Sequence, residues 1–125
     1  MAYNYSIVGK TMRGVETNKW NQKTLIMVCE TEKQFKYISS VLEEYNMYEY
    51  LPYSRTPCYP KYITFKLDQN LIVPKFDSPC ELKVWFRIKE WNVNYMDGVS
   101  LYIEHVDILK TEQVTIKVVH HRCLL

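Results

Sequence analysis

Residues 81–91, "ELKVWFRIKEW", have two faces of different composition. Successive side chains of a β-strand point to opposite faces. One face of this stretch is apolar and consists of Leu82, Val84, Phe86 and Ile88. The other face sets cations among aromatic rings and consists of Glu81, Lys83, Trp85, Arg87, Lys89 and Trp91. The stretch therefore predicts a strand with one face in a core and a second face that offers positive charge and ring surface.

Four further segments are expected to be strands: residues 3–11, 23–30, 61–67 and 99–109. Residues 23–30 are mostly apolar and β-branched, and the other three segments alternate between apolar and polar residues, as strands do. In residues 99–109, the apolar residues Val99, Leu101 and Ile103 occupy alternate positions, whereas Val106 comes three positions after Ile103 and is out of phase with them. This change of phase predicts a β-bulge near Glu104 or His105.

Turn-forming residues separate these segments. Gly14 permits a bend after the first strand, and residues 18–22 are a polar connection to the second. The Asp97-Gly98 pair predicts the turn between the last two strands. Residues 50–60 contain three prolines, so we expect an irregular loop or an extended arm there.

After Thr31, the spacing of the apolar residues changes from every second residue to every third or fourth residue. Apolar residues then recur as on one face of a helix: Phe35, Ile38, Val41, Leu42 and Tyr45. Thr31 or Glu32 is expected to begin this helix, which should span residues 33–48, and the Leu51-Pro52 pair excludes its continuation.

The number and length of these elements favour a mainly β fold. Short strands in a chain of 125 residues must form a barrel or a sandwich, because an open sheet would expose its edges and one face. We predict a five-stranded Greek-key barrel of the OB kind, with one α-helix inserted between strands two and three. An SH3-like barrel or a small sandwich is the alternative. The prediction treats residues 1–125 as a single domain, with a helical and Pro/Tyr-rich insertion at about 31–60 and an edge strand or tail at 112–125.

Composition excludes several classes of protein. No apolar run approaches the ~20 residues that a membrane span needs. The four cysteines form no CxxC pair and no signal peptide precedes them, so we expect reduced thiols and a cytoplasmic location. His120-His121-Arg122-Cys123 is a weak metal motif for which a frayed tail is the simpler interpretation. No catalytic motif or spacing is present, so neither an enzyme nor a cofactor is expected.

Five segments resemble, in order, the strands of OB-fold single-stranded-DNA-binding proteins: "VGKTMRG", "NKWNQKTLIMVCETEKQF", "PKYITFKL", "CELKVWFRIKEWN" and "GVSLYIEHVDILK". The pattern is similar to that of a small family found in Bacteroidetes and their phages. In that family a tryptophan-bearing connection leads to a strand that ends in Glu-Thr-Glu, here Trp20 through Glu30-Thr31-Glu32. Residues 33–59 look like an insertion relative to the family. The resemblance implies non-catalytic binding of single-stranded DNA in phage or bacterial replication, recombination or repair, by a homo-oligomer with replication proteins as further partners and no membrane.

Binding of single strands without sequence preference requires cations for the phosphates and aromatic faces for the bases. The residues that supply both are predicted to form the binding site: Lys19, Trp20, Lys23, Tyr62, Lys66, Lys83, Trp85, Arg87, Lys89, Trp91 and Tyr95. No catalytic or metal-binding residue is predicted.

Two other interpretations remain open from the sequence. The inserted helix or a partner subunit would close the site if it covered Trp85 and Trp91. Separately, Trp20 could serve as a cap over the barrel mouth and not as a binding residue. Alternatively, the domain is an interaction or assembly module of a replisome or phage particle. The acidic helix and the Tyr- and Pro-rich arm would then bind protein.

Overall fold

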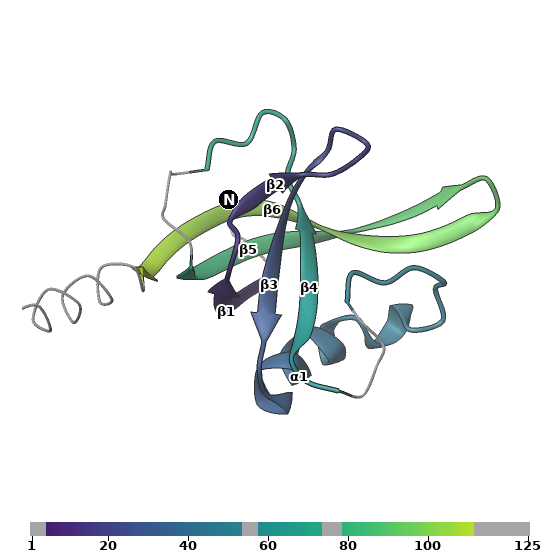
Figure 1. Cartoon of the computed structure of the whole chain (residues 1–125). Helices are drawn as coiled ribbons and strands as arrows, with labels where there is room; N and C mark the ends of the chain where they lie inside the picture. Colours follow the sequence, from purple (N-terminus) through teal and green to yellow (C-terminus); the bar gives the residue numbers. More distant parts are fainter. Residues whose placement is uncertain (1–4, 54–57, 74–78, 112–125) are drawn as a thin grey trace, which may run out of the picture.

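The computed structural model describes residues 5–53, 58–73 and 79–111 (Figure 1). The elements, in chain order, are β1 (Tyr5–Thr11), β2 (Val15–Thr17), β3 (Lys23–Cys29), α1 (Glu32–Val41), the 3-10 helix η1 (Glu43–Tyr45), β4 (Lys61–Lys66), β5 (Cys80–Val93) and β6 (Met96–Thr111). The predicted edge strand or tail at 112–125, with its His120-His121-Arg122-Cys123 cluster, lies outside the described residues.

The strands close into a barrel. Neighbours follow the order β1-β5-β6-β4-β3-β2, and Lys10 of β1 pairs with Val28 of β3 to close the ring. Because β1 and β2 are one strand bent at Gly14 (φ 73°), the described part of the chain forms a five-stranded barrel. β4 and β6 run parallel, with Phe65 opposite Leu101. This order and this parallel pairing are those of the OB fold. The predicted fold class is confirmed, and the SH3-like barrel and the sandwich are excluded.

The inner faces of the strands form the core. Its members include Leu25, Met27, Ile63, Phe65, Leu82, Val84, Phe86, Leu101 and Ile103. Phe86 is fully buried at the centre, with its ring centroid 5.5 Å from that of Phe65 and 5.6 Å from that of Tyr5. The apolar face predicted for residues 81–91 therefore points into the barrel as far as Phe86, and Ile88 is only partly buried where the hairpin leaves it.

The predicted bulge is present in β6. Trp85 of β5 lies opposite His105, but the next residue, Phe86, lies opposite Ile103. Glu104 is thus the extra residue. The bulge lets β6 continue to bury Val106 after the phase of its apolar residues changes.

The predicted turn at Asp97-Gly98 is wrong. The structure places the turn at Asn94 and Tyr95, which have φ values of 52° and 66°, and Asp97 and Gly98 lie inside β6. Asparagine tolerates the left-handed backbone region, so it suits a two-residue hairpin turn. The tip of this long hairpin projects away from the barrel (Figure 1).

Helix α1 begins where the sequence predicts. The Thr31 side chain accepts a hydrogen bond from the backbone N–H of Gln34, whose side chain accepts one from the backbone N–H of Thr31. The helix is shorter than the predicted 33–48, because Leu42 (φ −98°, ψ 12°) leaves the helical region to bury its side chain and η1 follows. The insertion falls between barrel strands two and three, as predicted, which in the present labels is after β3.

The helix covers one end of the barrel and not its wall. Phe35 and Ile38 are buried, and α1 packs against β1 and β3 near the end of the barrel (Figure 1). The face of β5 that carries the cations and tryptophans is therefore not covered by the helix.

Residues 50–53 complete the barrel wall where β4 and β6 separate. The carbonyl of Tyr50 accepts a hydrogen bond from the backbone N–H of Val99 (2.9 Å), and the carbonyl of Pro52 accepts one from that of Thr64 (2.8 Å). The first part of the predicted arm is thus docked on the chain's own barrel. Residues 54–57 are outside the described part.

Candidate nucleic-acid interface

A row of outward-facing side chains crosses four strands of the barrel. Thr24 of β3 pairs with Lys66 of β4, Lys66 with Tyr102 of β6, and Tyr102 with Arg87 of β5. Their neighbours inside the barrel, such as Leu101, are buried, so strand alternation fixes these four side chains on the outer surface. The row joins residues that are far apart in the sequence.

Cations gather around the Tyr102 ring. The guanidinium carbon of Arg87 lies 4.8 Å from the ring centroid, and Nζ of Lys89 lies 5.3 Å from it. Both distances are within the ~6 Å of a cation–π contact. Burial lowers the pKa of Lys66, and the positive charge of Lys89 lowers it further. An anion bound among these side chains would relieve the repulsion between the two lysines.

Trp91 is partly covered, but by the segment 50–53 and not by the helix. The Tyr50 ring stacks on the indole, with centroids 5.8 Å apart and an interplanar angle of 24°. The indole Nε1–H donates a hydrogen bond of 2.9 Å to Oγ of Ser100, and Nζ of Lys66 lies 5.7 Å from the ring. Trp91 is therefore a fixed ring beside a cation.

Gly98 is needed because Trp91 lies against its Cα. A Cβ at this position would overlap the indole ring. We expect Gly98→Ala to lower the free energy of unfolding by about 1–3 kcal/mol, the usual cost of overpacking. Chemical denaturation measures this value. Asn92→Ala, an exposed change in the same hairpin, should cost less than about 0.5 kcal/mol. An unchanged stability of Gly98→Ala would contradict the fixed position of Trp91.

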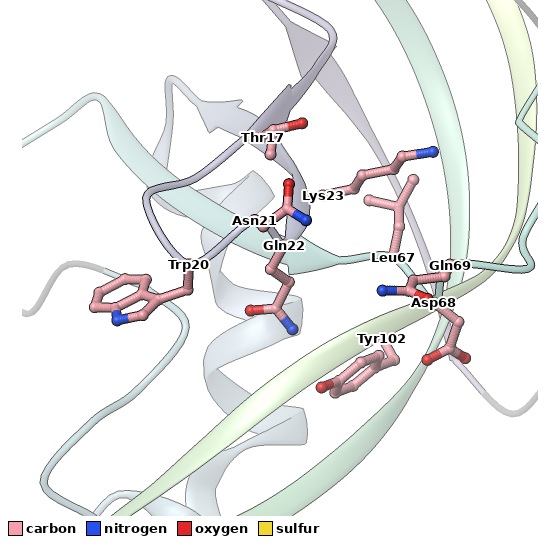
Figure 2. Close-up of a pocket in the computed structure, with 9 residues that line it drawn as sticks. All are labelled: Thr17, Trp20, Asn21, Gln22, Lys23, Leu67, Asp68, Gln69 and Tyr102. Atoms are coloured by element: carbon pink, nitrogen blue, oxygen red, sulfur yellow. The ribbon is translucent and has the colours of Figure 1, made fainter.

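Two grooves lie along this face. The loop groove, of about 650 Å³, is lined by Thr17, Trp20, Asn21, Gln22, Lys23, Leu67, Asp68, Gln69 and Tyr102 (Figure 2). The tyrosine groove, of about 380 Å³, is lined by Tyr50, Leu51, Pro52, Tyr53, Tyr62, Thr64, Lys66, Trp91, Val99 and Ser100. Because Lys66 and Tyr102 are paired across β4 and β6, the grooves adjoin at the centre of the face.

Most of the predicted site residues meet on this face. Those that line a groove are Trp20, Lys23, Tyr62, Lys66 and Trp91. Arg87 and Lys89 contact the Tyr102 ring, and Nζ of Lys19 lies 4.5 Å from the centroid of the Trp20 ring. Trp20 is 73% exposed and does not cap the barrel mouth.

Three more predicted residues, Lys83, Trp85 and Tyr95, lie away from the two grooves. Trp85 lies between Lys83, whose Nζ is 4.8 Å from the ring centroid, and the His105 ring, whose centroid is 5.0 Å away. It precedes Trp91 by six positions on β5, or about 20 Å of strand. Tyr95 is fully exposed at the hairpin tip. Alternation along the strand alone does not distinguish these residues from those in the grooves.

Several groove residues were not predicted. Tyr102 lies between the buried residues Leu101 and Ile103. The alternation of residues in β6 could therefore have placed its side chain on the outer surface of the barrel. Asp68 and Gln69 follow β4 directly and belong to a connection without a pattern. Tyr50 had been assigned to the arm.

The remaining chemistry in the described residues is limited. No group of three His, Cys, Asp or Glu residues within 5–53, 58–73 and 79–111 is placed to hold a metal ion. Burial raises the pKa of the Cys29 thiol to about 11, so this thiol stays protonated at neutral pH. Of the described helices, none has the length and apolar character to cross a membrane.

The sequence matches no model of a protein family, and no curated protein matches it. Among solved structures, a dimeric structure of the N-terminal domain of PriB protein from Thermoanaerobacter tencongensis is similar to this chain. The sequence identity is 8% and the TM-score 0.46, over 86% of this chain and 96% of that one. An identity and a TM-score this low say nothing about what the chain binds. The narrower resemblance to a family of Bacteroidetes and their phages stays a prediction.

Proposed function

We propose that this chain is a non-catalytic protein that binds single-stranded DNA, largely without sequence preference, along the two adjoining grooves. One observation carries the proposal: aromatic rings and cations lie together along two adjoining grooves on one face of the barrel. The rings of Trp20, Tyr102, Trp91 and Tyr62 line the grooves, and Lys23, Lys66, Arg87 and Lys89 lie beside them.

The chemistry of a single strand fits this arrangement. Each base that stacks on an aromatic ring contributes about 1–3 kcal/mol, and any base can do so. Cations at intervals along the same track neutralise phosphates and release counterions. Duplex DNA hides the faces of its bases, so it should contact the cations alone and bind more weakly.

The wider part of the proposal is biological. It places the protein in phage or bacterial DNA replication, recombination or repair, in the cytoplasm, acting as a homo-oligomer with replication proteins as partners. These points rest on the sequence resemblance, except the location, which rests on the cysteine pattern.

An interaction module of a replisome or phage particle is the second candidate. It is favoured by the exposed acidic residues of α1 and η1, Glu32, Glu43 and Glu44, and by the exposed Met47 that follows η1. The docking of residues 50–53 on the barrel removes part of the arm that this candidate would use.

Fluorescence titration tests the proposal, because the exposed Trp20 reports on stacking directly. A single strand of mixed sequence should quench the emission and bind more tightly at low salt than at high salt, and the same strand in a duplex should bind more weakly. Absence of quenching and of salt-dependent binding would refute the proposal. A pull-down that recovers protein but no DNA would favour the interaction module.

A further inference from the structure

The loop groove differs from the tyrosine groove in its polar side chains. The amides of Asn21, Gln22 and Gln69 and the carboxylate of Asp68 line it together with the Tyr102 ring. Figure 2 shows Gln22 on one side of Tyr102 and Gln69 with Asp68 on the other. Stacking alone does not require such groups, whereas reading the edge of a base does.

Asp68 is held in place but keeps a free acceptor. Its Oδ2 accepts hydrogen bonds from both terminal nitrogens of Arg87, at 3.3 Å each. Within the described residues no protein group hydrogen-bonds to Oδ1, and about half of the side chain is exposed. An ionised carboxylate only accepts hydrogen bonds. Oδ1 is therefore a fixed acceptor at the wall of the groove.

The amides of Gln22 and Gln69 are free to adapt. Neither side chain makes a hydrogen bond to another described residue, and each offers both a donor and an acceptor. Either amide can pair with a carbonyl oxygen or with an amino group of a base. Discrimination between bases must then come from Asp68, which pairs only with a donor.

We propose, building on the function proposed above, that the loop groove holds one base of the bound single strand and selects an exocyclic amino group over a carbonyl oxygen. The base stacks on Tyr102 and its amino group donates to Oδ1 of Asp68. A volume of about 650 Å³ is within the range of small-molecule sites, about 300–1,000 Å³. Cytosine, adenine and guanine carry such an amino group. Thymine and uracil carry none, and their single N–H donor lies between two carbonyl oxygens that the carboxylate repels.

Cytosine and uracil make the sharpest comparison. They differ along one edge of the ring, where cytosine carries an amino group beside an acceptor nitrogen and uracil a carbonyl oxygen beside an N–H, so size and stacking are nearly matched. We expect the protein to bind oligodeoxycytidine about fivefold more tightly than oligodeoxyuridine of the same length, about 12 nucleotides. The titration is run at mildly alkaline pH, which keeps cytosine unprotonated.

Two variants separate the effect of the Asp68 carboxylate on binding from the effect of the positive charge of Arg87. In Asp68→Asn the amide offers a donor as well as an acceptor, so the two oligonucleotides should bind with affinities whose ratio is about 1. In Arg87→Gln the carboxylate remains but the guanidinium no longer holds it, so both oligonucleotides should bind more weakly and a reduced preference for cytosine should persist.

The outcomes distinguish this inference from the proposed function. Salt-dependent binding of both oligonucleotides with equal affinity would overturn the inference and leave the function standing. Absence of binding by either oligonucleotide would overturn the function itself, and the inference with it. A cytosine preference that survives in Asp68→Asn would also overturn the inference, because the selection would then arise elsewhere.

Discussion

Replacing Lys66, Arg87 and Lys89 together by glutamine is expected to weaken binding of single-stranded DNA about 100-fold at about 0.1 M salt. Each phosphate contact to a single strand contributes about 0.7 to the slope of log K against log salt, so three contacts contribute about 2. The three cations lie around Tyr102 and Trp91, where the grooves adjoin. Titrations at several salt concentrations give both the affinity and the slope.

The matched control removes the same charge elsewhere. Arg13, Lys33 and Lys36 are exposed and line neither groove. Their joint replacement by glutamine should reduce affinity only slightly and leave the slope nearly unchanged, because distant charges act through a screened field. If both triple variants lost affinity equally, binding would depend on net charge and not on the grooves.

Replacing Phe86 by alanine should lower the free energy of unfolding by about 3–5 kcal/mol. The side chain is fully buried between the rings of Phe65 and Tyr5 at the centre of the barrel. Its removal leaves a cavity that closely packed neighbours on several strands do not fill. Denaturation by urea or guanidinium measures the loss.

Val93→Ala is the control within the same strand. Val93 is 53% exposed near the hairpin tip, so its truncation should cost less than about 0.5 kcal/mol. A loss below about 1 kcal/mol for Phe86→Ala would contradict the central position of this ring.

Local patterns in the sequence were enough to predict most of the fold. Alternation identified the inner faces of the strands, and the change of phase before Val106 located the bulge. Thr31 marked the start of the helix because its capping partner lies only three residues away, at Gln34. Each of these features depends on neighbours in the sequence.

Features that depend on distant residues were missed. Gly98 looks like a turn residue until Trp91 is placed against it from the paired strand. Tyr50 belongs to the barrel wall only because β4 and β6 separate beside it. Alternation places Lys66 and Tyr102 on the outer surface of their strands, but no local signal indicates that these two residues pair.

The two tryptophans of residues 81–91 now differ in role. Trp91 lines the tyrosine groove, fixed by Tyr50 and Ser100, whereas Trp85 lies with Lys83 and His105 outside both grooves. We therefore expect Trp91→Ala to weaken binding of single strands and Trp85→Ala to leave it nearly unchanged.

Photocrosslinking tests the central claim, that the two grooves hold the single strand, most directly. Iododeoxycytidine, whose base carries the amino group that the loop groove is proposed to select, forms covalent bonds in a single strand to aromatic side chains that it contacts. Mass spectrometry identifies the crosslinked residues. Crosslinks are predicted at Trp20, Tyr102, Trp91 and Tyr62, which line the grooves. Crosslinks at Trp85 or Tyr95 in place of these four residues would contradict the claim.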